Sequence, residues 1–365
     1  MIGAGAQRVM LNLIQGLSRR ELLVDLVVAR AKGQYLAQVP ESVRVIDLNA
    51  NRVLVSLFSL ISYLRCERPL AMLSALHYVN IIALWARRIA GVNTRLVVSE
   101  HNTLSRSLQH TRDGRGRFLP CLIKRFYPWA NRIIAVSEGV ADDLTQLTQI
   151  PRDCIKVIYN PVITPDVQKK AKDVIEEPWF DPNLPPVIIA VGRLDVQKDF
   201  QNLIKAFAQV RQMRPVRLMI LGEGPERSTL DNLIRELGVE QDVILRGFVE
   251  NPYAYMTYAS LFVLSSKFEG LPTVLIEALY CGAPVIATDC PSGPREILDS
   301  GRYGRLVPIN NSFALAQAIL EGLDGRIPLA SPKCWQPFLM DTVVDQYIEV
   351  LCNGQYGGGG DLIGL

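Results

Sequence analysis

Residues 266 to 296 read SKFEGLPTVLIEALYCGAPVIATDCPSGPRE, and the pattern of this stretch recurs through the rest of the chain. It contains an apolar helical run, VLIEAL, followed by a short apolar strand, PVIATD. Pro272 suits the first helical position, because its φ is fixed near the helical value. The stretch therefore predicts a loop, a buried helix and a strand in succession, which is the repeating unit of an α/β fold.

Two carboxylates, Glu269 and Glu277, flank the start of this helix with seven residues between them. A helix start presents unpaired backbone N–H groups, here those of Thr273 and Val274, and such groups attract phosphate. Because carboxylates repel phosphate, we expect the two glutamates to bind neutral hydroxyl groups. The pattern predicts a ligand that carries both a phosphate and sugars.

Strand-like and helical segments alternate on both sides of this stretch. In the second half, VIIAVGRL, VRLMILGEG, DVILRGF and LFVLSS are strand-like, and helical patterns separate them. Strands that alternate with helices of this length predict parallel, doubly wound sheets. The whole chain is therefore expected to form two Rossmann-like domains that face each other across a cleft.

The domain boundaries follow from length and composition. The 365 residues suffice for two domains of ordinary size, and the segment 162–186 contains five prolines, which is typical of a linker. The Gly-rich sequence GQYGGGGDLIGL at the C-terminus predicts disorder. The predicted parts are an N-terminal domain (1–170), a linker (171–186), a C-terminal domain (187–335), a last amphipathic helix (336–352) and a disordered tail (353–365).

Composition excludes several classes of protein. With 49% hydrophobic and 21% charged residues, the chain is neither disordered nor collagen-like. Its longest apolar run, VLVSLFSLISYL, is shorter than the about 20 residues that span a bilayer, and no secretory signal opens the chain. The seven cysteines form no CxxC pair, which favours reduced thiols over a disulfide framework. We expect a cytoplasmic protein.

Charge is distributed unevenly along the chain. Residues 1–175 hold 24 Lys and Arg against 13 Asp and Glu, whereas the remainder holds 15 against 23. A basic first half favours an anionic partner, such as lipid headgroups, a phosphorylated acceptor or nucleic acid. The segment 103–132 mixes basic and bulky apolar residues, which suits docking at a membrane interface but equally suits a solvated helix face above core aromatics.

Cations and one histidine occupy the ends of predicted strands. The loop GRLDVQKDF (192–200) offers Arg193 and Lys198, which suit a diphosphate, although such residues are also common on surfaces. His101 follows the strand RLVVSE at the edge where ligands bind in open α/β sheets. The alternative is a structural histidine in the core whose ring nitrogens are hydrogen-bonded within the protein. GEGPER (222–227) lacks the last glycine of a dinucleotide fingerprint, and neither HExxH nor Asp-x-Asp is present, so no metal site is predicted.

Eight segments occur in the order found in a known family. They are GAQRVMLNLIQGL, EHN, VSEGVADDL, VIYNPV, GRLDVQKDFQNLIKAF, LGEGPERSTL, VILRGFVENP and KFEGLPTVLIEALYCGAPVIATDCPSGPREIL. In these motifs the chain resembles the retaining, GT-B-fold glycosyltransferases of group 1 type, a large bacterial family with two glutamates seven residues apart. The resemblance covers nearly the whole chain and is strongest from Val191 to Pro308.

The resemblance implies a role for each matching residue. Glu269 would bind hydroxyls of the donor sugar, Glu277 would hold the nucleotide ribose, and Arg193 and Lys198 would neutralise the departing diphosphate. His101 would face sugar and acceptor. The further donor-binding residues would be Gly5 near the reacting centre, Phe248 beside the base, and Gly270, Leu271, Thr273 and Val274 around the helix start.

The function that the resemblance implies is the transfer of a hexose from a nucleotide-diphosphate sugar, such as a UDP-sugar or GDP-mannose, to a lipid-linked or polysaccharide acceptor. It implies no cofactor, no metal and no nucleic acid, and action on the inner face of the cytoplasmic membrane in polysaccharide or lipopolysaccharide biosynthesis. The departing phosphate would accept the acceptor's proton.

One departure favours a second hypothesis. Family members usually begin with an apolar strand before the Gly-rich turn. Here that first strand is missing, and GAGAQ (3–7) stands in place of the family's Gly-Gly-Ala-Glu. The alternative is a catalytically inactive relative that binds nucleotide sugar or serves as an assembly subunit. An epimerase lacks support, because only His101 is placed as a further acid or base.

Overall fold

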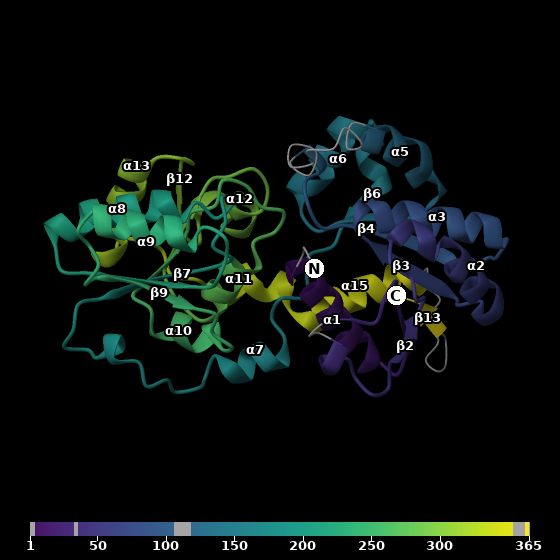
Figure 1. Ribbon diagram of the computed structural model, residues 1–365, viewed down its shortest axis with the longest axis horizontal. Coiled ribbons are helices and arrows are strands. Elements are labelled where there is room, and N and C mark those ends of the chain that lie inside the picture. The colour runs from purple at the N-terminus through teal and green to yellow at the C-terminus, as the bar shows by residue number, and fades with distance from the viewer. Residues whose placement is uncertain (1–3, 33–35, 106–117, 353–361, 365) are drawn as a thin grey trace. The chain divides into compact units, whose positions relative to one another are not determined.

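The computed structural model describes residues 4–32, 36–105, 118–352 and 362–364. The chain forms two compact units (Figure 1). Unit 1 comprises residues 1–162 and 338–365, and unit 2 comprises residues 163–337. Each unit contains one parallel β-sheet with helices packed on it, which confirms the predicted α/β fold of two Rossmann-like domains.

Unit 2 has a six-stranded parallel sheet in the order β12-β11-β10-β7-β8-β9. The chain builds outward from β7 to β8 and β9, then returns to the other side of β7 and adds β10, β11 and β12. In this doubly wound order, ligands bind at the carboxyl ends of the two central strands, here β7 and β10. The strands are β7 (Val187–Val191), β8 (Arg217–Leu221), β9 (Val243–Gly247), β10 (Leu261–Leu264), β11 (Val285–Thr288) and β12 (Arg305–Val307).

Helices cover both faces of this sheet, and this explains its apolar strands. Helices α8, α9 and α13 lie on one face, and α10 and α11 on the other (Figure 1). The strand β7, VIIAV, is consequently buried at every position but its last, as expected for a parallel strand between two helical layers. The helices are α8 (Phe200–Met213), α9 (Arg227–Glu236), α10 (Pro252–Tyr258), α11 (Thr273–Tyr280), α12 (Pro294–Ile297), α13 (Ser312–Leu323) and α14 (Pro332–Trp335).

The division between the units lies at Val162 and Ile163, before the expected domain boundary at residue 170. The helix α7 (Pro165–Lys170) belongs to unit 2, because α10 holds it there. The side chain of Asn251 donates a hydrogen bond to the Lys170 carbonyl oxygen at 3.0 Å, and the Thr257 hydroxyl donates one to the Ala171 carbonyl oxygen at 3.0 Å. These contacts cannot be predicted from sequence composition alone.

Unit 1 has a seven-stranded parallel sheet in the order β2-β1-β13-β3-β4-β5-β6. Its helices α1 and α15 pack against each other and share a core with β1, β3 and β4. The elements are α1 (Ala4–Ser18), β1 (Leu23–Val28), β2 (Arg44–Asp47), the 3₁₀ turn η2 (Val53–Val55), α2 (Ser56–Glu67), β3 (Ala71–Ala75), α3 (His77–Ala90), β4 (Arg95–Glu100), α5 (Leu119–Phe126), β5 (Arg132–Ala135), α6 (Glu138–Thr148), β6 (Ile155–Val157), α15 (Met340–Cys352) and β13 (Leu362–Gly364).

The C-terminal tail differs from its prediction. Disorder was expected over 353–365, but residues 362–364 form β13, which lies between β1 and β3. The prediction is wrong there because a parallel ladder uses backbone N–H and C=O groups, so a short segment can pair with two neighbours whatever its composition. Residues 353–361 and 365 lie outside the described residues. The place between β1 and β3 at the centre of the sheet is thus occupied in part by residues 362–364.

The last helix, α15, returns the chain to unit 1. Its apolar face is buried, and the Arg95 side chain of β4 donates a hydrogen bond to the Val350 carbonyl oxygen at 2.7 Å. Gly16 of α1 lies so close to this helix that an added Cβ would stand 2.4 Å from a methyl group of Val344. Close packing of α1 on α15 therefore requires a glycine at this position.

The described helices include none that could cross a membrane. Within residues 4–32, 36–105, 118–352 and 362–364, no helix has the length and the apolar character that a bilayer-crossing segment needs.

Candidate functional site

The centre of the unit 2 sheet brings two predicted loops together. The loop 192–199 follows β7 and the loop 265–272 follows β10, and these strands are neighbours. Because parallel strands end at the same edge of a sheet, the two loops meet there. The Ser265 hydroxyl donates a hydrogen bond to the Lys198 carbonyl oxygen at 2.7 Å, and the Lys267 amide donates one to the Gln197 carbonyl oxygen at 2.8 Å. Backbone contacts therefore hold the two loops in register.

Lys198 and Glu269 form an ion pair at this junction. The Lys198 Nζ and Glu269 Oε1 atoms are 2.6 Å apart, and the side chains are only 16% and 8% exposed. The Ser266 hydroxyl donates to the same carboxylate oxygen at 2.6 Å, and Gln197 Nε2 donates to the other oxygen at 3.3 Å. Breaking such a largely buried pair is costly, so each charge holds the other in place. Lys198 was expected to bind the diphosphate of a donor and Glu269 its sugar, and in the structure the two side chains contact each other.

Arg193 has no such partner. Its side chain is exposed, and within the described residues no carboxylate pairs with its guanidinium group. The backbone of its loop is fixed, because the amide of Leu194 donates a hydrogen bond to the Glu223 carbonyl oxygen at 3.0 Å. A planar guanidinium on a fixed backbone is suited to a phosphate oxygen.

Glycines allow the loops at this edge to pack closely. Gly222 of the GEGPER loop has a φ of +142°, and an added Cβ would stand 1.9 Å from the Gly192 carbonyl oxygen. Gly293 has a φ of +91°, and its added Cβ would stand 2.4 Å from a ring carbon of Pro272. These positions exclude side chains. The glycine of GEGPER therefore serves loop packing.

The start of α11 differs by one residue from its prediction. Pro272 was expected at the first helical position but is the N-cap, because its ψ of 92° is extended. The helix begins at Thr273 and no side chain caps it, so the amides of Thr273 and Val274 lack intrahelical partners. Glu277 lies in the second turn of the helix and is buried. The amides and this carboxylate thus lie on one short helix, as the sequence indicated.

Gly270, Leu271 and Phe248 follow strands at the same edge of the unit 2 sheet, whereas Gly5 belongs to unit 1. Leu271 is buried, and the Gly270 carbonyl oxygen accepts a hydrogen bond from the Ser292 hydroxyl at 2.7 Å. Phe248 follows β9, two strands from β7, and its side chain is 81% exposed. Gly5 was expected in a Gly-rich turn, but the structure places it in the first turn of α1. That prediction is wrong because the apolar packing of α1 outweighs the helix penalty of one glycine, about 1 kcal/mol.

In unit 1, His101 follows β4 and is 7% exposed. Burial lowers the pKa of His101 to about 4, so its ring is neutral near pH 7. Its Nε2 atom lies 3.2 Å from the Ser99 hydroxyl, which also hydrogen-bonds to Tyr347 of α15. Its Nδ1 atom is buried and has no partner among the described residues. A buried, unpaired ring nitrogen is costly, which favours a ligand at this position.

A polar cluster beside His101 was missed from the sequence. The Glu100 carboxylate is buried and pairs with His77, whose Nδ1 lies 2.5 Å from Glu100 Oε2. Tyr127 and Asn80 both donate hydrogen bonds to the other carboxylate oxygen. The available signal was a carboxylate, Glu100, directly after the apolar run LVV of a predicted strand. Its partners come from distant segments, so the sequence does not reveal them.

The two charges in this cluster stabilise each other. Burial disfavours the charged form of Glu100, but the His77 charge and three hydrogen bonds outweigh it and lower the pKa of Glu100. Burial likewise opposes the charge of His77, yet the Glu100 carboxylate raises the pKa of His77 above its ordinary value. The raised pKa favours the protonated form of His77, whereas the lowered pKa of His101 favours its neutral form. Among the described residues, no three His, Cys, Asp or Glu side chains group as metal ligands.

The basic segment 103–132 is described only in part, because residues 106–117 lie outside the described residues. The ring of Phe126 lies 5.0 Å from Trp129 of the same segment and 5.3 Å from Trp85 of α3. Arg88 and Arg125 lie over the Trp129 ring at 5.4 and 5.5 Å. Both guanidinium groups therefore form cation–π contacts with the Trp129 ring.

Two family models match the chain. The model described as "Glycosyl transferases group 1" matches residues 172–332, and that described as "Glycosyltransferase Family 4" matches residues 3–164. The two matches correspond closely to unit 2 and to the first segment of unit 1.

Curated relatives include proteins named as glycosyltransferases. The chain is 37% identical over 243 residues, 66% of its length, to N-acetylgalactosamine-N,N'-diacetylbacillosaminyl-diphospho-undecaprenol 4-alpha-N-acetylgalactosaminyltransferase of Campylobacter jejuni. It is 33% identical over 184 residues, 49% of its length, to lipopolysaccharide 1,6-galactosyltransferase of Salmonella typhimurium. The matches span 63% and 48% of those relatives' own lengths.

Solved structures share the fold. A glycosyltransferase of Rickettsia africae superposes with a TM-score of 0.80 at 16% identity, covering 97% of this chain and 96% of that one. The HepE protein of Anabaena, solved in complex with UDP and glucose, superposes with a TM-score of 0.72 at 21% identity, covering 96% of both chains.

The ion pair between His77 and Glu100 yields a stability prediction. The substitution His77→Gln leaves a buried carboxylate without its cation, and we expect the free energy of unfolding to fall by about 3 kcal/mol near pH 6. Because the folded pKa of His77 is raised, the pair contributes fully below the unfolded pKa of about 6.5 and is lost as pH rises through the folded value. Thermal unfolding of both proteins at about pH 6 and about pH 9 measures this, and the difference should shrink at the higher pH.

The double variant His77→Gln/Glu100→Gln is the matched control. It removes both charges, so part of the lost stability should return. A loss that is equal at both pH values and unchanged in the double variant would show that His77 acts only through packing.

Proposed function

This chain belongs to the GT-B glycosyltransferases of group 1 type, and we propose that it transfers a hexose from a nucleotide-diphosphate sugar to a lipid-linked or polysaccharide acceptor. The observation that carries the proposal is the Lys198–Glu269 pair at the carboxyl ends of β7 and β10. It places a cation and a hydrogen-bond acceptor for hydroxyls where ligands bind in this fold. The proposed setting is bacterial glycan biosynthesis, as the names of the relatives indicate for those proteins.

The proposed donor is a UDP-sugar or GDP-mannose. A related fold, that of HepE, has been solved with UDP and glucose, which supports a nucleotide sugar. In the proposal Glu277 binds the ribose, Glu269 binds sugar hydroxyls, and the amides at the start of α11 bind phosphate oxygens. A carboxylate inside a short helix and uncapped amides at its start suit these two kinds of group.

The proposed chemistry follows from charge. Breaking the bond between sugar and diphosphate places negative charge on the β-phosphate and leaves an oxocarbenium-like sugar. Lys198 and Arg193 lie on one fixed loop, and the α11 start adds positive partial charge, so protein groups neutralise the leaving group without a metal. Because Glu269 already holds Lys198 at 2.6 Å, the cation is positioned before the donor binds. We propose retention of configuration, with the departing phosphate accepting the acceptor's proton.

The proposed acceptor site is in unit 1. The neutral His101 presents a buried ring nitrogen without a partner among the described residues, which suits a sugar hydroxyl or a phosphate oxygen. The excess of Lys and Arg over residues 1–175 suits an acceptor that carries a phosphate. The Campylobacter jejuni relative is named for an acceptor joined to undecaprenol through a diphosphate.

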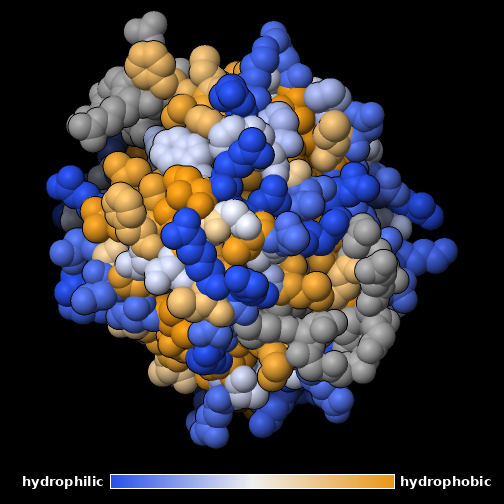
Figure 2. All heavy atoms as spheres, turned by 90° about the vertical axis from the view of Figure 1, so that its right-hand side faces the viewer, coloured by the Kyte–Doolittle hydropathy of each residue, from blue (hydrophilic) through white to orange (hydrophobic). Residues whose placement is uncertain are grey.

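We also propose that unit 1 binds an anionic membrane surface. Leu54, Val55 and Phe58 of η2 and α2 are 62%, 59% and 79% exposed. Figure 2 shows the face of unit 1 that includes α2, where apolar side chains lie interspersed among hydrophilic ones. Exposed apolar side chains on a unit with an excess of Lys and Arg over residues 1–175 suit a surface that lies at an anionic lipid headgroup layer.

Turnover of nucleotide sugars tests the proposed activity. Given a lipid-linked acceptor, the purified protein should release UDP or GDP from one of a set of UDP- and GDP-sugars. Separation of the reaction mixture with ultraviolet detection measures the released nucleoside diphosphate. Lys198→Ala should lower kcat by about 100-fold with a smaller change in KM, because its charge matters most as the leaving group departs. Lys205→Ala, at an exposed position of α8, is the matched control and should have no effect.

Two outcomes would contradict parts of this proposal. If Lys198→Ala changed KM alone, Lys198 would not stabilise the departing diphosphate. Nucleotide-sugar binding without turnover of any donor would favour the inactive, ligand-binding alternative.

The ribose assignment has its own test. Glu277→Gln should weaken UDP or GDP binding by about 10-fold or more, because a charge-assisted hydrogen bond contributes about 1.5–3 kcal/mol. Titration calorimetry with the nucleoside diphosphate measures this without any need for turnover. The control is Glu236→Gln, at the exposed end of α9, which should bind normally. Equal affinity of both variants would mean that Glu277 does not contact the nucleotide.

Vesicle flotation tests the membrane proposal. The protein should float with vesicles that contain anionic lipid at low salt, and binding should weaken as salt rises. Phe58→Ser should reduce flotation several-fold, because it removes an exposed apolar side chain from the proposed surface. The matched control is Phe313→Ser in α13 of unit 2, where the native side chain is 66% exposed. Failure to float at low salt would contradict the proposal.

A further inference from the structure

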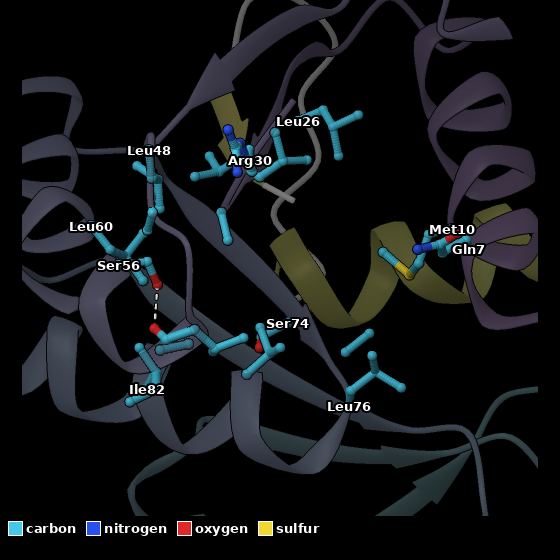
Figure 3. Close-up of a pocket in the computed structure, with 18 of the residues that line it drawn as sticks. Gln7, Met10, Leu26, Arg30, Leu48, Ser56, Leu60, Ser74, Leu76 and Ile82 are labelled. Carbon is cyan, nitrogen blue, oxygen red and sulfur yellow. Dashed lines mark hydrogen bonds between the residues drawn. The ribbon is translucent and has the colours of Figure 1, made fainter. Parts of the chain in front are cut away.

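Two cavities differ in what lines them. The cavity of unit 1 has a volume of about 710 Å³ and a mainly apolar lining, and Figure 3 shows Met10, Leu60 and Ile82 among the side chains around it. A cavity of unit 2 has a volume of only about 20 Å³, room for about one water molecule. Three acidic residues and one lysine are among those that line it: Asp195, Asp199, Glu226 and Lys267.

Asp199 and Lys267 form a second ion pair between the two loops of the candidate site. The Asp199 Oδ1 and Lys267 Nζ atoms are 3.2 Å apart, and the Asp199 side chain is only 8% exposed. The first pair joins Lys198 to Glu269 at 2.6 Å. Each loop thus contributes one positive and one negative side chain, and consecutive residues of the first loop reach across to the second. The junction is therefore held by two ion pairs of opposite polarity.

The backbone of Asp199 has an unusual conformation. Its φ of 49° and ψ of 44° are left-handed, and its side chain accepts no capping hydrogen bond from α8, although Asp199 is the N-cap of that helix. An N-cap aspartate ordinarily has an extended backbone and caps its helix. A residue other than glycine in the left-handed region persists where its surroundings hold it there, and such residues cluster at functional sites. Here the carboxylate contacts Lys267 instead of the helix.

Lys267 carries the positive charge of the small cavity. Among the described residues that line the cavity, it is the only lysine, arginine or histidine. Asp195, on the same lining, supports the first loop directly, because its Oδ1 atom accepts a hydrogen bond from the Lys198 amide at 3.2 Å. Without the Lys267 ammonium group, the carboxylates around this cavity would repel one another. The loop that carries Lys198 would then move.

We propose that Asp199 and Lys267 are positioning residues, whose ion pair fixes the backbone at residue 199 and so holds Lys198 against Glu269. The peptide bond between residues 198 and 199 is rigid, so the conformation at 199 determines where Lys198 lies. The inference rests on the proposed function, in which Lys198 stabilises the departing diphosphate. It assigns the fine placement of that cation to a pair of side chains beneath the site.

The first test measures the placement of Lys198 without any turnover. The Lys198 side chain is 16% exposed and contacts Glu269, so acetic anhydride should label it slowly in the native protein. In Lys267→Met, mass spectrometry should show labelling of Lys198 that is faster by about 5-fold or more, because the loop is released. Labelling of Lys205, at an exposed position of α8, is the internal reference and should not change. Lys267→Arg keeps the charge and should label like the native protein.

The second test measures turnover of the nucleotide sugar. Lys267→Met and Asp199→Asn should each lower kcat by about 10-fold with a smaller change in KM, and the double variant should be no worse than either. Lys267→Arg should retain most of the native kcat. Asp199→Gly separates backbone from charge, because glycine adopts the left-handed conformation without strain. It should lose as much activity as Asp199→Asn.

The remaining outcomes decide between the alternatives. Native kcat in Asp199→Gly would show that only the backbone conformation matters and would overturn the role of the ion pair. A lower midpoint of thermal unfolding in Lys267→Met, with unchanged labelling of Lys198 and unchanged kcat, would reduce the pair to a stabilising contact. Faster labelling in Lys267→Met together with no turnover by the native protein would support the positioning role and contradict the proposed transferase activity.

Discussion

The adjacency of β7 and β10 is the constraint on which the candidate site in unit 2 depends. Lys198 and Glu269 are 71 positions apart in the chain, yet their charged atoms lie 2.6 Å apart because their loops leave neighbouring strands at the same edge. The hydrogen bonds from Ser265 and Lys267 to the backbone of the facing loop fix this arrangement. A buried ion pair contributes little net stability, since desolvation offsets the attraction. Its position at a ligand-binding edge is therefore better explained by chemistry than by stability.

Unit 1 places a second pair of opposite charges at the carboxyl edge of its own sheet. Glu100 ends β4 and is neutralised by His77 at the start of α3, while the adjacent His101 stays neutral. The C-terminal helix supports this edge from a distance in sequence, because Tyr347 hydrogen-bonds to Ser99, the neighbour of His101. The return of α15 to unit 1 is thus part of how that edge is built. In both units the loops and helices around the edge have rigid, buried supports.

Much of this could be predicted from the sequence, and the reasons are local. The alternation of strand and helix patterns predicted two parallel sheets, because burial between two helical layers imposes continuous apolar runs such as VIIAV. The positions of Arg193, Lys198, Glu269 and Glu277 at strand ends and at a helix start followed from the same pattern. The pairing of Lys198 with Glu269 could not be predicted, because it depends on which strands are neighbours. The cluster of His77, Asn80, Glu100 and Tyr127 could not be predicted for the same reason, since its members come from one helix, one strand and a 3₁₀ turn.

By itself, the sequence determined the fold class, the helix start beside two carboxylates, and the cations that follow the first strand of unit 2. These depend on periodicity and on residue type, which act over a few neighbouring residues. Only the tertiary structure decided that Lys198 binds Glu269, that His77 and Glu100 share a buried charge, and that residues 362–364 enter the sheet of unit 1. The physical reason is that strand order and backbone pairing bring together segments that are far apart in the chain. No local sequence pattern encodes which strand pairs with which.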